Sequence, residues 1–330
     1  MRAAVCRVHG APEVVVVDDI PVPEVGPDQV RVAVHAAAVN FPDVLLIAGT
    51  YQVTVPPPFV PGSELAGVVE EVGGAAEGLA VGDRVTATMM VGAFAEHAVV
   101  PAGSVEPVPD GIDLRTAAAS GVAHRTAYHV LRSVGSVQPG EEIIVLGAGG
   151  GVGLAAVQLA TVLGATVTAV ASSPEKLQAA ASHGAARLVD HRDGDLRSSL
   201  REQLPEGADV VIDPVGGDLA EPALRSLRWG GRFVTVGYAS GSVPRIPLNL
   251  VLLKGVHVLG FQFIDFATHA PAALERNERE LAELLSSGRA VPHIGATFDL
   301  DDVVSALRLV ADGQAIGKVI VTSNDRGTTP

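Results

Sequence analysis

The first part of the chain, to about residue 118, carries short apolar runs that are separated by turn residues. The runs Val14–Val17 and Val30–Val34 are typical of strands, because Gly, Pro and charged residues bound them. Gly-Gly and Gly-Asp turn signals separate further predicted strands at Leu65–Val72, Arg84–Met89 and Ala95–Val100. The pattern predicts a small, mostly antiparallel β domain.

From about Ala117 the pattern changes to an Ala-rich helical stretch, Ala117–Leu131, and then strands and helices alternate. The predicted strands are Glu142–Leu146, Thr166–Val170, Arg187–Val189, Asp209–Ile212 and Arg232–Val236. The predicted helices between them are Val152–Leu163, Glu175–His183, Ser198–Leu204 and Leu219–Leu227. This alternation predicts βαβ crossovers and a doubly wound parallel sheet with helices on both faces.

The last stretch is predicted to hold a strand at His257–Leu259, helices at Leu274–Ser286 and Leu300–Ala311, and a strand at Lys318–Val321. It is too small for a third core, so we expect it to pack back on the β domain. The predicted domains are therefore 1–118, the first part of a catalytic domain, 119–262, a nucleotide-binding domain, and 263–330, the return to the catalytic domain.

Composition narrows the class of protein. The 330 residues include 37 Gly and are 48% hydrophobic, which suits a compact α/β fold rich in tight turns. The net charge of −14 and the lack of a basic block argue against nucleic acid and membrane partners. A single cysteine, Cys6, excludes an internal disulfide. The start of the chain does not look like a signal peptide, so we expect a cytoplasmic protein.

The strongest local signal is a glycine-rich turn between a predicted strand and a predicted helix. Glycine has no side chain, so the backbone of this turn can approach a pyrophosphate closely. The N-terminus of the following helix offers unpaired N–H groups to that anion. The residues expected to bind a dinucleotide here are Gly147, Gly150, Gly151, Val152 and Gly153.

The next strand indicates which dinucleotide is bound. NAD-selective domains place an acidic residue at the end of this strand, where it binds the ribose hydroxyls. Ala171 occupies that position, and Ser172, Ser173 and Lys176 follow with hydrogen-bond donors and one positive charge. We therefore predict NADPH as the cofactor, since nothing at this rim repels a 2′-phosphate.

Several motifs along nearly the whole chain resemble the medium-chain dehydrogenase/reductase superfamily, and within it the zinc-free NADPH:quinone oxidoreductases of zeta-crystallin type. Besides the glycine turn they are Val39-Asn40-Phe41-Pro42-Asp43 with Gly49-Thr50-Tyr51, Pro61-Gly62-Ser63-Glu64-Leu65-Ala66-Gly67-Val68-Val69, Val81-Gly82-Asp83-Arg84-Val85, Asp213-Pro214-Val215-Gly216-Gly217 and Gly317-Lys318-Val319. The resemblance implies an α/β protein with a GroES-like β-rich catalytic domain, a doubly wound Rossmann domain and a nicotinamide cleft between them. It also implies a homodimer that joins Rossmann sheets edge to edge, here through Val256–Phe261.

The resemblance also bears on metal binding. Where the zinc-dependent relatives have Cys, His and Cys ligands, this chain has Asn40, Ser63 and Val122, so Glu64 alone cannot supply a zinc site. We therefore expect no metal. Without a Lewis acid, an acceptor that spreads the developing charge over a conjugated system is favoured, such as a quinone.

The resemblance implies further site residues. Asn40, Asp43 and Tyr51 are the expected catalytic residues, with Asn40 and Tyr51 as hydrogen-bond donors and Tyr51 or water delivering the proton. The expected cofactor contacts are Thr126, His191, Gly237, Phe261, Phe263 and Lys318, and His191 with Arg192 could serve the 2′-phosphate.

For several of these residues a structural role is the alternative. Asn40 and Asp43 could cap a helix or turn, and Tyr51, Phe261 and Phe263 could be core aromatics. Two other functions also stay open: reduction of a 2-enoyl thioester or enone, as in the polyketide enoylreductase domains that share the Asn-x-x-Asp block, and NADPH binding with little turnover.

Overall fold

The computed structural model describes residues 1–323, and the chain divides into two compact units. The catalytic unit comprises residues 1–122 together with the described part of the segment from Pro292, and the nucleotide unit is Ala123–Val291. Each unit contains one main β-sheet of its own. The division confirms the expected separation of a β-rich unit from a doubly wound unit.

The catalytic unit is built on a seven-stranded sheet in the order β14-β15-β3-β4-β5-β7, with β6 paired to β3. All pairs are antiparallel except β14 with β15. The strands are β3 (Gln29–Val39), β4 (Glu64–Val72), β5 (Arg84–Thr88), β6 (His97–Pro101), β7 (Val105–Pro107), β14 (Ile294–Asp299) and β15 (Lys318–Thr322). A separate hairpin joins β1 (Arg2–Cys6) to β2 (Val15–Asp19). The helices of the unit are α1 (Phe41–Ala48), α2 (Leu114–Ser120) and α11 (Val303–Ala311).

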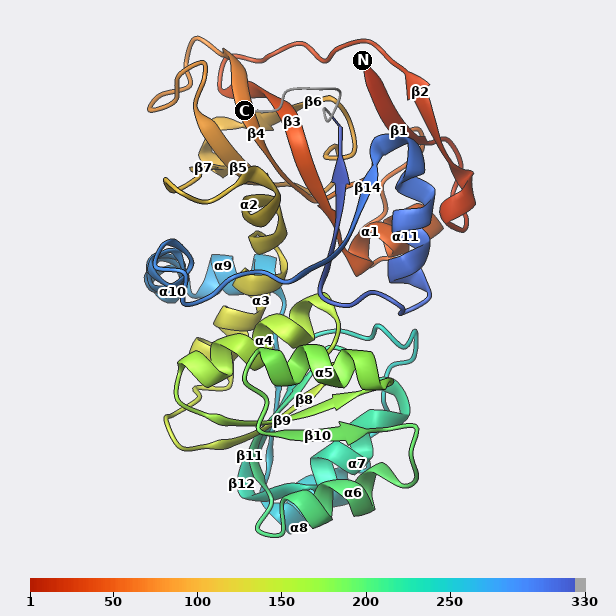
Figure 1. Ribbon diagram of the computed structural model, residues 1–330, viewed down its shortest axis with the longest axis vertical. Coiled ribbons are helices and arrows are strands. Elements are labelled where there is room, and N and C mark those ends of the chain that lie inside the picture. The colour runs from red at the N-terminus through yellow and green to blue at the C-terminus, as the bar shows by residue number, and fades with distance from the viewer. Residues whose placement is uncertain (324–330) are drawn as a thin grey trace. The chain divides into compact units, whose positions relative to one another are not determined.

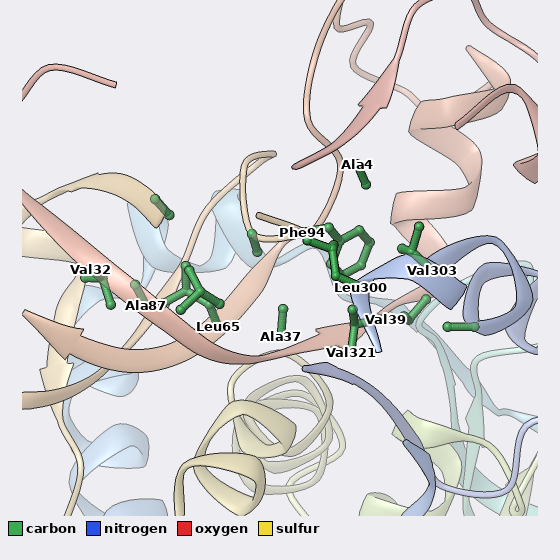
Figure 2. Packing of buried hydrophobic residues seen from close by; sticks show 14 of the residues in the cluster. Ala4, Val32, Ala37, Val39, Leu65, Ala87, Phe94, Leu300, Val303 and Val321 are labelled. Carbon is green, nitrogen blue, oxygen red and sulfur yellow. The ribbon is translucent and has the colours of Figure 1, made fainter. Parts of the chain in front are cut away.

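The core of the catalytic unit brings together residues from both ends of the chain. Phe94 lies in the same apolar cluster as Leu65 of β4, Leu300 and Val303 near the start of α11, and Val321 of β15 (Figure 2). Phe94 is 1% exposed and Leu65 is fully buried. The C-terminal strand therefore completes a core that the first part of the chain cannot close alone.

The nucleotide unit is a six-stranded parallel sheet in the order β10-β9-β8-β11-β12-β13. Its strands are β8 (Glu142–Leu146), β9 (Thr166–Ala171), β10 (Arg187–Asp190), β11 (Ala208–Asp213), β12 (Leu227–Thr235) and β13 (His257–Gly260). In Figure 1 α4 (Gly151–Val162) and α5 (Pro174–Ser182) cover one face, while α6 (Leu196–Gln203), α7 (Ala220–Arg225) and α8 (Leu248–Lys254) cover the other. The doubly wound sheet expected from the sequence is confirmed.

The segment after β13 departs from the expected domain boundary. The sequence predicted that the chain returns to the catalytic domain at residue 263, but α9 (Phe263–His269) and α10 (Pro271–Ser286) belong to the nucleotide unit. Polar contacts with α3 (Ala123–His129) hold these helices in the nucleotide unit. On α10, Glu278 Oε1 lies 2.7 Å from Arg125 Nε and 2.8 Å from His129 Nε2, both on α3.

A second set of contacts ties α10 to the π-helical turn η3 (Val130–Val134) that continues α3. Asn277 is fully buried, and its Nδ2 donates to Ser133 Oγ at 2.8 Å and lies 3.0 Å from His129 Nδ1. Arg132 Nε donates to Glu280 at 2.9 Å. These bonds hold α10 on α3, so the return to the catalytic unit comes only at Pro292.

The sequence also predicted one helix over Ala117–Leu131, where the structure has α2 and α3 with a break at Gly121 and Val122. Three short helices, α1, α8 and α9, were not predicted. Within residues 1–323 no helix combines the length and the apolar character needed to cross a lipid bilayer.

Candidate active site

The glycine-rich turn links β8 to α4 in the nucleotide unit. Gly147 has φ +60°, a conformation that residues with a Cβ rarely adopt. Gly150 is the N-cap of α4. A Cβ on Gly153 would clash with the Gly147 carbonyl oxygen. The predicted residues, which include Gly151 and Val152 in the first turn of α4, thus form a turn of bare backbone at a helix N-terminus, a geometry that fits a pyrophosphate.

Basic side chains gather at the carboxyl ends of β9 and β10. Ala171 is the last residue of β9 and pairs in register with Asp190, so the residues after both strands share one edge of the sheet. Burial lowers the pKa of Lys176, and the positive charge of Arg192 lowers it further. Burial also lowers the pKa of His191; the negative charge of Asp190 opposes this shift, and the positive charges of Arg192 and Lys176 add to it. Lys176, His191 and Arg192 thus lie close enough to repel one another when they are charged. A bound anion would relieve that repulsion, so this edge of the sheet is favourable for an anion.

Two serines complete this edge. Ser173 is the N-cap of α5, and its side chain accepts a hydrogen bond from the Lys176 backbone N–H. Ser172 Oγ lies 3.4 Å from Lys176 Nζ. The structure therefore brings together Ser172, Ser173, Lys176 and His191, which the sequence assigned to the cofactor, next to the buried methyl group of Ala171.

In the catalytic unit Asn40 lies between β3 and α1 and is the N-cap of that helix. Asp43, in the first turn, accepts a hydrogen bond from the Asn40 backbone N–H through Oδ2 at 2.7 Å. Asn40 is 7% exposed and Asp43 is fully buried. The two predicted catalytic residues thus lie together, but both side chains point into the protein interior.

A buried ion pair lies beside Asn40. Lys318, the first residue of β15, places its Nζ 2.8 Å from Glu64 Oε1 and 2.6 Å from Asn40 Oδ1. Asn40 Nδ2 donates to the same Glu64 oxygen at 2.8 Å. The other oxygen of Glu64 accepts from the Val122 backbone N–H at 2.6 Å. We call Asn40, Ser63, Glu64, Val122 and Lys318 the polar cluster, since Ser63 Oγ also lies 3.2 Å from Asn40 Nδ2.

Asp43 borders the polar cluster and has an unusual protonation equilibrium. Burial raises its pKa to about 7, against the opposing effects of the Asn40 backbone N–H, the Ser63 hydroxyl and the charge of Lys318. The negative charge of Glu64 adds to the increase. Asp43 therefore changes its charge near neutral pH, whereas an exposed Asp is ionised there.

Tyr51 follows α1, which ends in the left-handed Gly49. The ring is half-buried against the core of the catalytic unit. Burial raises the pKa of its phenol, a hydrogen bond with Gln52 opposes this increase, and the charge of Asp43 adds to it. Of the three predicted catalytic residues, Tyr51 is the one whose side chain retains substantial exposure.

The remaining predicted cofactor residues lie on three segments of the nucleotide unit. Thr126 is half-buried on α3, and Gly237 follows β12. Phe261 and Phe263 pack around His129, with ring centroids 6.2 and 5.6 Å from the imidazole. Both phenylalanines are half-buried, so each has a packing role and keeps an accessible edge.

Comparison with known proteins places these two units in a family. Residues 26–110 match the alcohol dehydrogenase GroES-like domain, and residues 151–287 match the zinc-binding dehydrogenase domain. Quinone oxidoreductase-like protein 2 of Bos taurus is 36% identical over 97% of this chain and 92% of its own length. This chain belongs to the quinone oxidoreductase family of the medium-chain dehydrogenases/reductases.

Two further relatives bear on function. The crystal structure of Escherichia coli quinone oxidoreductase complexed with NADPH has a TM-score of 0.90 and 28% identity, and the match covers 98% of this chain and 100% of that one. Polyketide synthase GfsB of Streptomyces halstedii is 37% identical over 89% of this chain, which corresponds to 5% of that protein. In sequence, this chain is therefore also similar to one small part of a much larger synthase.

The name of the second matched domain raises the question of whether zinc fits this member of the quinone oxidoreductase family. Zinc sites are built from Cys, His and carboxylate ligands. The polar cluster instead offers an amide, a hydroxyl, a backbone N–H and one carboxylate, and both Glu64 oxygens already accept hydrogen bonds. Within residues 1–323 no three His, Cys, Asp or Glu side chains lie close enough to share a metal. The residues of the polar cluster do not fit zinc.

Sequence reasoning missed the pairing of Glu64 with Lys318. Glu64 was considered only as a residual metal ligand, and Lys318 was assigned to the cofactor. A signal was present, because each of the two charged residues directly precedes an apolar run, Leu65-Ala66 after Glu64 and Val319-Ile320-Val321 after Lys318. Two opposite charges at buried strand ends are expected to pair, because an isolated buried charge is costly.

Proposed function

We propose that this protein reduces quinones or other conjugated carbonyl acceptors by hydride transfer from NADPH, without a metal. The glycine-rich turn and the edge around Ala171 would hold the cofactor, and bound NADPH would supply the hydride. The single observation that carries the acceptor class is the composition of the polar cluster. Its one carboxylate, Glu64, already accepts hydrogen bonds at both oxygens, so the cluster offers no set of ligands for a metal that could stabilise the alkoxide of a simple ketone.

The chain's own residues divide into two roles in this proposal. Asn40 was expected to donate to the acceptor, but its amide oxygen faces Lys318 and its Nδ2 faces Glu64 and Ser63. Asn40 and Asp43 are therefore proposed to position neighbouring residues from inside the catalytic unit and not to contact the acceptor. Tyr51 stays the proposed donor, because the residue is only half-buried and a phenol hydroxyl can hydrogen-bond the carbonyl oxygen of the acceptor as charge develops there.

Cofactor choice can be tested at Ala171. In the Ala171→Asp variant a carboxylate would stand beside Lys176, so it would repel a 2′-phosphate and accept from ribose hydroxyls. We expect the ratio of kcat/KM for NADPH to that for NADH to fall at least tenfold. Ala186→Asp, an exposed position before the amino end of β10, is the matched control. An unchanged ratio for Ala171→Asp together with an unchanged ratio for Lys176→Met would contradict the assignment.

The class of acceptor can be tested by comparing several acceptors in one assay. Reduction of enones or 2-enoyl thioesters is a second candidate function, and the similarity to a polyketide synthase favours it. NADPH oxidation measured with 1,4-quinones, simple enones and a crotonyl thioester separates the two, since we expect the highest kcat/KM with quinones. Tight NADPH binding without turnover on any acceptor would support a cofactor-binding protein instead.

We also propose a homodimer formed through the nucleotide unit. The strand β13 lies at the edge of its sheet and pairs only with β12 among the described strands. Apolar side chains are exposed on the neighbouring strand β12, with Trp229 at 82%, and on α8, which precedes β13 in the chain, with Leu252 at 81% and Leu253 at 74%. Leu252→Glu should convert the dimer to a monomer in sedimentation velocity, and Val81→Glu, on an exposed position of the catalytic unit, should not.

The expected location is a reducing compartment such as the cytoplasm. The chain has a single cysteine, Cys6, and so cannot form an internal disulfide, which fits a protein of a reducing compartment. Fractionation of cells with an antibody to the chain would test this location directly.

A further inference from the structure

All three hydrogen-bond donors of the Lys318 ammonium group have acceptors inside the catalytic unit. The acceptors are Glu64 Oε1 at 2.8 Å, Asn40 Oδ1 at 2.6 Å and the Val39 carbonyl oxygen at 3.3 Å. The side chain is 4% exposed and that of Glu64 is 1% exposed. Lys318 therefore has no donor left for a cofactor phosphate, which was the role expected from the sequence.

The polar cluster has the connectivity of a small coordination site with a cation at its centre. Lys318 binds the carboxylate of Glu64 and the amide oxygen of Asn40, and the Val122 backbone N–H satisfies the second Glu64 oxygen. One positive charge supplied by the chain itself thus takes the central place in a cluster that does not fit zinc.

We propose that Lys318 is an internal cation that acts as a positioning group at the centre of the polar cluster. It balances the buried charge of Glu64 and fixes the orientation of the Asn40 amide. Asn40 is the N-cap of α1, and α1 leads directly to Gly49 and Tyr51. Lys318 thereby sets the position of the Tyr51 hydroxyl through Asn40 and α1, without touching cofactor or acceptor. The kinetic part of this inference rests on the proposed function.

The test is a double-mutant cycle with Lys318→Met and Glu64→Gln. Each single variant leaves one buried charge without its partner, so we expect Tm to fall by about 10 °C. The double variant removes both charges and should recover more than half of that loss. The exposed pair Arg308 and Glu13 in the same unit is the control, and Arg308→Met with Glu13→Gln should show no such recovery.

Kinetics separate positioning from cofactor binding. In the double variant we expect kcat to fall at least tenfold while KM and Kd for NADPH stay within twofold, because only the placement of Tyr51 changes. Lys318→Arg keeps the charge and should retain more activity than Lys318→Met. A rise in the Kd for NADPH of tenfold or more with unchanged kcat would overturn the proposal in favour of direct cofactor contact.

Two measurements do not depend on turnover. Wild-type protein dialysed against zinc should contain far less than one zinc per chain, and stoichiometric zinc would overturn the inference. Absence of recovery in the double variant would also overturn it, because the buried charges would then not be coupled. If no acceptor is reduced by the wild type, the proposed function fails, while the Tm cycle and the zinc content still decide whether Lys318 is an internal cation.

Discussion

The pKa of Asp43 predicts an unusual dependence of stability on pH. Burial is the main cause of the increase from the ordinary value of 3.8 to about 7. Because the folded-state pKa is higher than the unfolded one, the folded protein binds more protons between these two values. The contribution of Asp43 to stability is therefore fully present below pH 3.8 and is lost as the pH rises through about 7.

The magnitude follows from linkage. Between pH 5 and pH 8 a single group with these two pKa values changes the free energy of unfolding by about 2.5 kcal/mol. Asp43→Asn removes the titration while it keeps an oxygen that can accept from the Asn40 backbone N–H. From pH 5 to pH 8 the wild type should therefore lose about 2.5 kcal/mol of unfolding free energy relative to the variant.

The assay is urea unfolding of wild type and Asp43→Asn at four pH values from 5 to 8, with the two proteins compared at each pH. Asp195→Asn is the control, because Asp195 is an exposed N-cap whose pKa the Ser198 hydrogen bonds lower. A lowered pKa changes stability only below 3.8, so this control should be flat over the range. A flat difference for Asp43→Asn as well would refute the reasoning that burial governs this carboxyl.

Three further predictions concern the cofactor turn and the two cores. Gly153→Ala should raise the Kd for NADPH at least tenfold in a fluorescence titration, because its Cβ would clash with the Gly147 carbonyl oxygen; an unchanged Kd would contradict the assigned turn. Asn277→Ala should lower the free energy of unfolding by about 2 kcal/mol, because the buried ring of His129 loses a hydrogen-bond partner. Phe94→Ala should cost about 4 kcal/mol in urea unfolding, because it empties the centre of the catalytic core.

The parts of the fold that the sequence predicted well are those with strong local periodicity. The strand Glu142–Leu146 was predicted with its observed bounds, and the parallel sheet followed from the alternation of strands with helices. The boundary at residue 263 was wrong because nothing local marks it. It depends on contacts of Asn277 and Glu278 with α3, about 150 residues away in the chain. The sequence likewise did not indicate the helix break at Gly121 and Val122, because both residues lie within an Ala-rich run.

The candidate site divides in the same way. The glycine turn and the edge around Ala171 are contiguous motifs, so their residues could be found from the sequence. The polar cluster joins positions 40, 64, 122 and 318, and its bonds depend on β3, β4 and β15 lying side by side in one sheet. No spacing along the chain encodes that register. The sequence therefore identified Asn40 and Lys318 but assigned both to external partners, where the structure pairs them with each other.

The polar cluster and Asp43 form one electrostatic system, so the two lines of experiment constrain each other. The charge of Lys318 lowers the pKa of Asp43, and the charge of Glu64 raises it. Removing Lys318 alone should therefore move the pH at which stability is lost upward, and removing Glu64 alone should move it downward. If Lys318 were instead turned away to bind a cofactor, its loss would leave the titration of Asp43 unchanged. Opposite shifts in the two single variants thus require an ammonium group that stays in the interior of the catalytic unit.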